Sequence, residues 1–432
     1  MGLFGPKTTK IKPAKGLAGA VQFPGDKSIS HRYAMLAAIA EGTSEIHFFS
    51  TSADCQSTLS CLKQLAVKIE RKENVVTIQG AGLGGLRRAR DPLDAGNSGS
   101  TMRMLAGILA GQPFRSVMTG DASLSRRPMK RVADPLTQMG ARITLQEGGL
   151  PPLEIEGGAL KPIHYQMPVA SAQVKSTVLL AGLFAEGETE VIEKVRTRDH
   201  TEIALEQMGA DIGRHQRTIA VRGRGRLEGR KLYVPGDFSS AAFFIIAALI
   251  TPHSNLTLHN VGLNPTRTGI LDVLVPMGGR VSVINLEMMN GELIGDLHIE
   301  TSKLAGGEIP PSAVPGLIDE LPVLAVLGTQ TEQGITFRGA AELRIKESDR
   351  LAAVAENLKR MGAEVEEFPD GLRVAGQQTL RGAEIDPRDD HRIAMAFAVA
   401  GLVAQGDTQI KNSSCVDISF PDFFDTLARV TE

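Results

Sequence analysis

The chain repeats one kind of helix opening six times. Each copy begins with a turn of small or charged residues and continues as a run rich in Ala, Leu, Ile and Met. The copies recur roughly every 70 to 80 residues, which indicates one supersecondary unit used repeatedly. They begin at Gly25, Gly96, Ala170, Gly236, Ile318 and Asp389.

The segments that follow the helices recur as well. A Gly and an alternating strand come next, as in GTSEIHFF and GETEVIEKV, a pattern typical of half-buried strands. A second helix then stops at a Met-Gly pair in QMGARI, QMGADI, PMGGRV and RMGAEV, where Gly suits a left-handed C-cap. Hairpins such as VKIERKENVVTIQG complete the unit. This order predicts an α/β protein with mixed sheets.

The length of 432 residues exceeds one ordinary core, so six units favour two domains of three units each. We expect one domain over residues 24–236 and the other over 1–23 plus 237–432. If the segment AKGLAGAVQ pairs with the C-terminal half, the chain crosses twice between the domains. A double crossing suits closure over a substrate in the cleft between the domains.

Composition narrows the class of function. A formal net charge of −2 argues against a general nucleic-acid binder. The longest apolar runs are shorter than the ~20 residues of a membrane span, and no signal-peptide pattern opens the chain, so we expect a cytoplasmic protein. The three cysteines form no metal-binding or disulfide pattern, and we interpret them as structural thiols. We also expect a monomer.

The predicted helix starts carry groups suited to anions. A helix N-terminus offers free N–H groups and a positive dipole, and several such ends with Lys and Arg beside them would bind a multiply anionic small molecule. These first turns hold Lys27, Ser28, Arg32, Asn97, Arg103, Gln173, Lys175, Asp319, His391 and Arg392.

Two further segments are rich in charge. SLSRRPMKR, from Ser123, places four cations around a proline turn, and ELRIKESDR, from Glu342, would place Lys346 and Arg350 one turn apart on a helix. Taken alone, each segment also fits a solvated surface.

Three other interpretations are weaker. Gly80–Gly85 matches G-x-G-x-x-G, but Pro92 interrupts any following helix, so a loop is favoured over a dinucleotide site. A Ser/His/Asp hydrolase lacks a G-x-S-x-G elbow. Asp390-His391 alone does not make a metal site.

Taken in order, these segments resemble the enolpyruvyl transferases. The resemblance covers nearly the whole chain and rests on GDKSISHR, LDAGNSGSTMR, SLSRRPM, SAQVK, TRDHTE, IDELP, ELRIKESDR and DDHR. SAQVK and RRPMKR are similar to the bacterial subgroup called class II. The resemblance implies two globular domains, each of three βαβαββ units, in an inside-out, barrel-like arrangement.

The resemblance also implies a reaction. The 5-hydroxyl of shikimate 3-phosphate attacks C2 of phosphoenolpyruvate, and phosphate leaves, with no metal or organic cofactor. The net charge and the short apolar runs in turn predict no nucleic-acid and no membrane partner. It implies catalytic roles for Asp319 as base, Glu347 at the methylene carbon and Lys27 at the developing charge. The implied phosphoenolpyruvate pocket is Lys27, Asn97, Gly99, Arg127, Gln173, Arg350 and Arg392. The implied shikimate 3-phosphate pocket is Lys27, Ser28, Arg32, Ser171, Ala172, Gln173, Arg198, Asp319 and Lys346.

Some positions depart from the family pattern. Ile418 stands where many relatives have a pocket Lys, Glu342 stands where others have Asn, and Arg198 differs from the other subgroup. Gly99 implies room for glyphosate in the phosphoenolpyruvate site. Two alternatives stay open. A UDP-N-acetylglucosamine enolpyruvyl transferase is disfavoured because its loop cysteine is absent from Gly120–Arg127. A non-catalytic anion-binding or nucleic-acid-binding protein is disfavoured because Asp319 and Glu347 would repel a polyanion.

Overall fold

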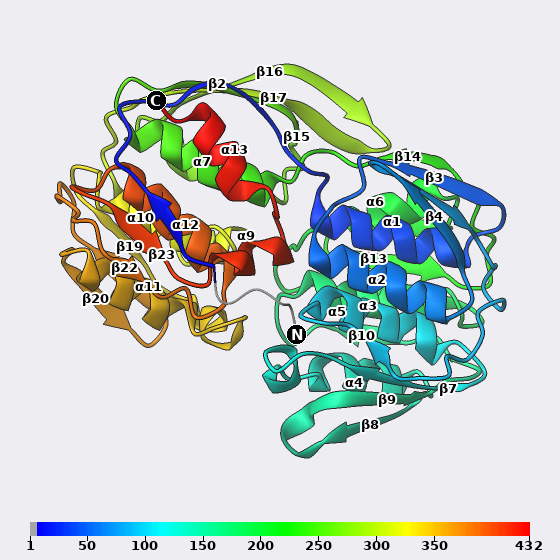
Figure 1. Ribbon diagram of the computed structural model, residues 1–432. Helices are drawn as coiled ribbons and strands as arrows, with labels where there is room; N and C mark the ends of the chain where they lie inside the picture. The colour runs from blue at the N-terminus through cyan, green and yellow to red at the C-terminus, as the bar shows by residue number, and fades with distance from the viewer. Residues whose placement is uncertain (1–6) are drawn as a thin grey trace. The chain divides into compact units, whose positions relative to one another are not determined.

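The computed structural model describes residues 7–432 and has a mixed α/β fold. The chain divides into two compact units (Figure 1). Of the described residues, unit 1 contains 7–24 together with Pro235–Glu287 and Leu293–Glu432. Unit 2 contains Gly25–Val234 and the short segment Met288–Glu292. Each unit buries its own hydrophobic cluster, as expected for a chain too long for one core.

Unit 2 contains three four-stranded sheets that share one order of strand directions. In each sheet the first strand is parallel to the second, and the remaining neighbours are antiparallel. In spatial order the strands are β14 (Lys231–Tyr233), β3 (Thr43–His47), β5 (Val75–Gln79) and β4 (Lys68–Lys72); β6 (Leu93–Asp94), β7 (Arg115–Thr119), β9 (Leu150–Glu156) and β8 (Arg142–Gln146); and β10 (His164–Gln166), β11 (Glu188–Ile192), β13 (Thr218–Arg222) and β12 (Ile212–His215).

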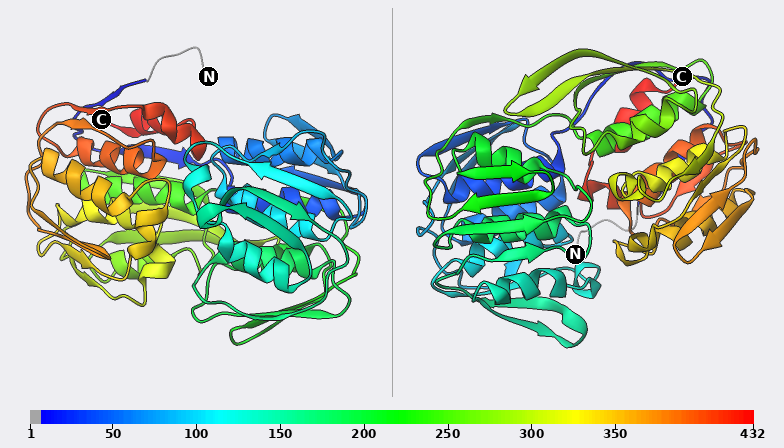
Figure 2. Two further views of the ribbon diagram at one scale, coloured as in Figure 1. Left: turned by 90° about the horizontal axis from the view of Figure 1, so that it is seen from below. Right: turned by 180° about the vertical axis from the view of Figure 1, so that it is seen from behind.

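The helices of unit 2 include three that are buried almost throughout, α1, α3 and α5. Their C-terminal halves are apolar on nearly every side, which is typical of helices surrounded by other elements. Each begins where an N-cap side chain, Asp26, Ser98 or Ser171, accepts a hydrogen bond from a backbone N–H three residues later. The right panel of Figure 2 shows strands of this unit in front of its helices. The helices are α1 (Lys27–Ile39), α2 (Ala53–Gln64), α3 (Gly99–Ala110), α4 (Lys130–Gln138), α5 (Ala172–Gly182) and α6 (His200–Gln207), with 3-10 turns η1 (Leu124–Arg126) and η2 (Glu147–Gly149).

Unit 1 contains two four-stranded sheets and one three-stranded sheet. Its strands, in spatial order, are β16 (Arg280–Met289), β17 (Glu292–Glu300), β15 (Asn255–Gly262) and β2 (Ala18–Gln22); β18 (Gly307–Ile309), β19 (Ile335–Phe337), β21 (Gly371–Val374) and β20 (Val365–Phe368); and β1 (Thr9–Ile11), β23 (Thr408–Ile410) and β22 (Glu384–Ile385). Strand β2 pairs in parallel with β15, which confirms the predicted pairing of the N-terminal segment with the C-terminal half.

The helices of unit 1 repeat the pattern of buried, apolar helices. α7, α10 and α12 pack against one another inside the unit, and their residues are buried nearly throughout. The helices are α7 (Phe238–Ile250), α8 (Gly269–Leu274), α9 (Val314–Leu317), α10 (Leu321–Gly328), α11 (Arg350–Arg360), α12 (His391–Leu402) and α13 (Phe423–Val430), with 3-10 turns η3 (Ala341–Ile345) and η4 (Ser413–Ile418).

The hairpin formed by β16 and β17 has its tip in unit 2. The Nδ1 of His200 lies 2.6 Å from Oε1 of Glu292, and both side chains are 2% exposed. The backbone N–H of Tyr233 donates to Oδ1 of Asn290 at 2.9 Å. The tip is thus held by polar contacts on two sides.

All six predicted helix openings lead into helices, and all four Met-Gly stops are confirmed. The glycine after each Met has a left-handed φ, between 83° and 110°, which L side chains rarely adopt. The four glycines are Gly140, Gly209, Gly278 and Gly362.

Three expectations about local structure have definite outcomes. The helix predicted through Lys346 and Arg350 is wrong: η3 ends at Ile345, Lys346 is extended, and Asp349 caps α11, which begins only at Arg350. The segment Gly80–Gly85 is a loop, as predicted. Every sheet found over residues 7–432 is open, so no closed barrel is present there.

The three cysteines are free and buried, as expected for structural thiols. Over residues 7–432, no helix combines the length and the apolar character that crossing a membrane requires.

Candidate active site

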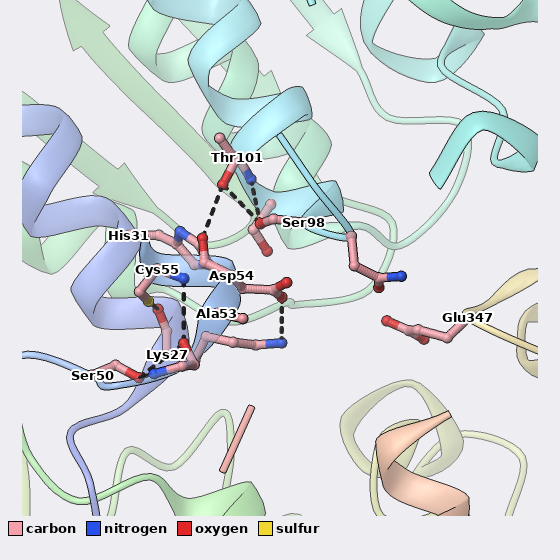
Figure 3. Close-up of polar contacts among 12 residues, drawn as sticks. Lys27, His31, Ser50, Ala53, Asp54, Cys55, Ser98, Thr101 and Glu347 are labelled. Atoms are coloured by element: carbon pink, nitrogen blue, oxygen red, sulfur yellow. Dashed lines mark hydrogen bonds and ion pairs between the residues drawn. The ribbon is translucent and has the colours of Figure 1, made fainter. Parts of the chain in front are cut away.

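The start of α1 places a lysine beside a carboxylate (Figure 3). Lys27 is the first residue of α1, and Asp26 caps the helix by accepting a hydrogen bond from the N–H of Ile29. The Nζ of Lys27 lies 2.8 Å from Oδ2 of Asp54, which is in the first turn of α2. A cation in a first helical turn opposes the helix dipole and needs an anion nearby. The chain supplies one itself, in Asp54.

The start of α3 holds a second group of polar side chains. Nη2 of Arg127 donates to Oδ1 of Asn97 at 3.0 Å. Arg103, in the second turn of α3, donates from Nη1 to Oε1 of Gln173 at 2.7 Å. A methyl group on Gly99 would lie 2.9 Å from Nη1 of Arg103 and 3.6 Å from Nη1 of Arg127. Gly99 therefore lies close to two guanidinium groups.

The start of α5 joins this group. Ser171 caps α5 by accepting a hydrogen bond from the N–H of Val174 at 3.4 Å, and Ala172 and Gln173 form the first turn. Nε2 of Gln173 donates to Oγ of Ser100 at 3.0 Å, in the first turn of α3. Gln173 thus connects two helix starts that both carry predicted site residues.

Arg32 is turned into unit 2 rather than toward solvent. Its side chain donates from Nη1 to the carbonyl oxygen of Ser28 at 2.8 Å, from Nε to Oγ1 of Thr201 at 2.6 Å, and from Nη2 to Oγ of Ser176 at 2.9 Å. Arg32 is only 4% exposed. These contacts connect α1 to α5 and α6, so several of its donors already have protein partners.

Two other cations of unit 2 have different surroundings. Arg198 is half-buried just before α6. Lys175 lies 2.6 Å from a carboxylate oxygen of Glu202 and 3.1 Å from one of Glu193, in a pocket that leaves it 1% exposed. Burial raises the pKa of Glu202, although the charge of Lys175 opposes the shift. The expectation that Lys175 faces an external anion is wrong, because carboxylates of its own unit surround it.

In unit 1, one arginine joins both predicted proton-transfer carboxylates. Arg350 lies with Nη2 2.6 Å from Oε2 of Glu347 and Nη1 3.5 Å from Oδ1 of Asp319. Its Nε donates to Oδ2 of Asp390 at 2.8 Å. Burial alone would lower the pKa of Arg350, but the charges of Asp390, Glu347 and Asp319 outweigh burial and raise it. Arg350 is therefore a permanent cation in a nearly closed setting.

Arg392 also contacts Asp319, because Asp390 caps α12 and fixes where Arg392 lies. Nη1 of Arg392 donates to the carbonyl oxygen of Asp319 at 2.9 Å, and Nη2 lies 3.6 Å from Oδ2 of the same residue. Asp319 is not in a first helical turn, contrary to expectation. Asp319 lies in the turn between α9 and α10, and Pro322 is in the first turn of α10.

The other positions of unit 1 that the sequence analysis names are more exposed to solvent than Arg350. Lys346 is half-buried between η3 and α11, and Glu342 is half-buried on η3. Ile418 ends η4 and is half-buried. Over residues 7–432, no three His, Cys, Asp or Glu side chains are grouped so that they could hold a metal ion.

Sequence reasoning missed two carboxylates that organise these clusters. Asp54 lies in the first turn of α2, a helix outside the six recurring openings, and no local motif marks it. The sequence draws attention to Asp390 only as half of a weak Asp-His metal pattern, yet Asp390 is 0% exposed and contacts Arg350. Each carboxylate is recognised by the cation that it contacts, Lys27 for Asp54 and Arg350 for Asp390, and that cation lies far away in the sequence.

The fold and these clusters define a class: an α/β protein that gathers arginine, lysine and carboxylate groups at helix starts, as anion-converting enzymes do. Comparison with known proteins narrows the class. The family model for EPSP synthase (3-phosphoshikimate 1-carboxyvinyltransferase) matches residues 11–427. The chain belongs to this family.

Individual relatives agree over nearly their whole lengths. A 3-phosphoshikimate 1-carboxyvinyltransferase of Solibacter usitatus is 55% identical over 98% of this chain and 99% of its own, and one of Koribacter versatilis is 54% identical over 99% and 100%. The solved structure of EPSP synthase from Acinetobacter baumannii superposes with a TM-score of 0.88 at 44% identity, covering 99% of this chain and 98% of that chain.

Proposed function

We propose that this chain carries out the reaction for which its relatives are named. It transfers the enolpyruvyl group of phosphoenolpyruvate to the 5-hydroxyl of shikimate 3-phosphate and releases phosphate, a step of aromatic amino-acid biosynthesis. The full-length match to the EPSP synthase family supports this assignment. Both substrates are polyanions, which suits the cationic groups at the helix starts.

The observation that carries the proposed mechanism is the bridge made by Arg350. As the hydroxyl oxygen bonds to C2, Asp319 takes the hydroxyl proton and Glu347 gives a proton to the methylene carbon. As the bond from C2 to the phosphate oxygen breaks, Glu347 takes a methylene proton back and the proton held by Asp319 leaves with phosphate. Asp319 and Glu347 contact the same guanidinium, at 3.5 Å and 2.6 Å. A fixed cation next to both carboxylates holds their orientation. Lys27 stabilises charge that develops on the transferred group.

The binding roles are assigned by cluster. For phosphoenolpyruvate they fall to Lys27, Asn97, Gly99, Arg127, Gln173, Arg350 and Arg392. For shikimate 3-phosphate they fall to Lys27, Ser28, Arg32, Ser171, Ala172, Gln173, Arg198, Asp319 and Lys346. Arg32 differs from the others because it contacts Thr201 and Ser176 within unit 2, so its role includes holding α1 in place.

Finer features of the molecule are part of the same proposal. The chain uses one βαβαββ unit six times, three in each of two domains, and acts as a cytoplasmic monomer with no cofactor. The shared strand order of the three sheets in unit 2 supports the repeat. Gly99 leaves room for glyphosate, and inhibition that phosphoenolpyruvate overcomes is the expected result.

The rival substrate is UDP-N-acetylglucosamine. Its transferases carry a reactive loop cysteine, whereas the cysteines here are all buried. Burial raises the pKa of Cys55 and of Cys61 to about 12, so neither is a ready thiolate nucleophile. This chemistry disfavours the rival.

Phosphate release from phosphoenolpyruvate tests the assignment. Purified protein should release phosphate when shikimate 3-phosphate is added, but not with UDP-N-acetylglucosamine. Asp319→Asn should lower kcat by about 10²- to 10⁴-fold, because it removes the base and nearly keeps the shape. Asp407→Asn is the control, since Asp407 is an exposed carboxylate of the same unit, paired with Lys10. No release from the wild-type protein, or equal kcat values for the two variants, would contradict the proposal.

A further inference from the structure

A buried chain of hydrogen bonds lies behind Lys27. His31 follows Lys27 by about one turn of α1 and is 0% exposed. Its Nδ1 lies 2.7 Å from Oγ1 of Thr58, which lies 2.7 Å from Oγ1 of Thr101. The hydroxyl of Thr101 in turn donates to Oγ of Ser98 at 2.8 Å (Figure 3). One side chain from α1, one from α2 and two from the start of α3 thus form a single chain.

The imidazole in this chain is neutral. Burial lowers the pKa of His31 well below its ordinary value, and the nearby charges of Lys27 and Arg32 lower it further, against the weaker effect of Asp26. From α2, Asp54 lies beside Lys27, and the thiol of Cys55 points to the Lys27 carbonyl. From α3, the groups in the chain are hydroxyls, which do not titrate in the ordinary pH range.

Neutrality gives the chain one direction. A neutral imidazole has one N–H donor and one bare nitrogen acceptor. Because the Thr101 hydroxyl donates to Ser98, it accepts from the Thr58 hydroxyl, and Thr58 must accept from His31. His31 is therefore the Nδ1–H tautomer, and the hydroxyls of Thr58 and Thr101 have defined orientations.

The chain connects elements that carry proposed active-site residues. Ser98 caps α3 by accepting from the N–H of Thr101, and Gly99 is the next residue along. At the other end of the chain, Lys27 of α1 is paired with Asp54 of α2. Buried hydrogen bonds polarise one another and rigidify their surroundings. Nε2 of His31 lies outside this chain of bonds and has no hydrogen-bond partner among residues 7–432. Shifts of about 1 Å in such a site cost about a hundredfold in rate.

We propose that His31 is a positioning residue which, through Thr58 and Thr101, fixes the Lys27–Asp54 pair relative to the Ser98–Gly99 start of α3. This inference rests on the proposed function for its kinetic consequence. It does not make His31 a proton donor or acceptor in the reaction. It assigns a purpose to a buried histidine that is not among the proposed substrate-binding residues.

Two substitutions at His31 separate hydrogen bonding from packing. Asn places an amide where Nδ1 of His stands, so His31→Asn can still donate to Thr58, whereas His31→Leu fills the space and donates nothing. His31→Leu should lower kcat about tenfold or more with a smaller change in KM, and His31→Asn should restore most of the loss. Equal kcat values for His31→Asn and His31→Leu would overturn the proposal.

The link through α2 has its own test. Thr58→Val keeps the shape of the side chain and breaks the chain of hydroxyls, and it should lower kcat to a similar extent. Combined with His31→Leu it should cost nothing more, because both changes break one chain. The control is Thr189→Val, at a buried threonine of β11 whose hydroxyl has no hydrogen-bond partner among residues 7–432. Additive losses, or a wild-type kcat in Thr58→Val, would overturn the proposal.

A readout without turnover keeps this inference distinct from the proposed function. In protein labelled with ¹⁵N-histidine, the Nδ1 of His31 should have the chemical shift of a protonated ring nitrogen, and Thr58→Val should change it. If wild-type protein shows this signal but releases no phosphate, the proposed function fails while the hydrogen-bond chain stands. If Nδ1 is unprotonated in an active enzyme, the proposed direction of the chain is wrong.

Discussion

A single methyl group at Gly99 tests how tightly the arginines at the start of α3 are placed. Gly99→Ala puts Cβ 2.9 Å from Nη1 of Arg103, where ordinary contacts begin near 3.4 Å. The guanidinium must therefore move by about half an ångström. That movement is opposed by its hydrogen bond to Gln173, which is 2.7 Å long.

The opposing energies can be compared. Ala in place of Gly stabilises a fold by about 0.4–1 kcal/mol where the backbone permits it, and Gly99 has no left-handed φ. Losing a hydrogen bond that involves a charged group costs about 1.5–3 kcal/mol. The hydrogen bond dominates, so we expect a net loss of about 1–2 kcal/mol in the free energy of unfolding. Because Gln173 is a proposed contact of both substrates, kcat/KM should fall about ten- to a hundredfold.

The assay is phosphate release at varied phosphoenolpyruvate, with urea unfolding measured on the same samples. Gly158→Ala is the matched control, because a methyl there meets nothing within 4 Å. The decisive variant is Gly99→Ala combined with Arg103→Ala. Without the Arg103 side chain, the methyl group at position 99 loses its close contact with that residue. Adding Gly99→Ala to Arg103→Ala should therefore cause no further loss of kcat/KM or stability.

Two results would refute this reasoning. One is a kcat/KM for Gly99→Ala within about twofold of the wild-type value. The other is an equal cost of the methyl with and without Arg103, which would place its effect elsewhere than in the predicted steric contact.

Four other predictions follow from buried groups. Arg350→Lys, which cannot make the forked contacts to Glu347 and Asp390, should lower the free energy of unfolding by about 3 kcal/mol in urea titrations; an unchanged midpoint would contradict it. Lys175→Met leaves buried carboxylates without their cation and should cost about 3–5 kcal/mol by the same measurement, whereas Lys194→Met, an exposed neighbour, should cost little. Since the pKa of His31 is lowered in the folded chain, the unfolded chain takes up a proton that the folded chain refuses, so stability should fall below pH ~6.5 by up to about 1.4 kcal/mol per pH unit, and His31→Asn should reduce that slope. The thiols of Cys55 and Cys61, with pKa values near 12, should resist iodoacetamide at pH 8 until the protein is unfolded, and rapid labelling of the folded chain would show that they are accessible.

The recurring elements were predictable because their signals are local. Apolar runs after small-residue turns predicted six helices. The Met-Gly pairs predicted where the second helix of a repeat ends, because a left-handed C-cap depends on a single residue. The helix predicted from Glu342 to Arg350 was wrong because the i, i+4 spacing of its charges is a weaker signal than the capping residue Asp349. Asp349 caps the helix, and the helix begins after it.

The composition of the clusters was less predictable, since it depends on residues far apart in the sequence. Lys27 and Lys175 look alike as cations near helix starts, yet one is partnered by Asp54 and the other is enclosed by Glu193 and Glu202. Charge type is visible in a sequence, but burial and partner are tertiary properties. The family resemblance identified Arg350, whereas its bridge between two carboxylates required coordinates.

The tip of the β16–β17 hairpin limits how this protein can be dissected or permuted. A fragment ending at Val234 would contain His200 without Glu292, although both belong to one compact unit. Halves expressed separately after cuts only near Pro24 and Pro235 would each carry a defect. The half that contains unit 2 would lack residues 288–292, and the half that contains unit 1 would keep the β16–β17 hairpin without the partners of its tip. A fragment design that grafts residues 288–292 onto the first half is the natural remedy. New termini placed in that tip would be poorly tolerated, although hairpin turns are usually safe places to open a chain.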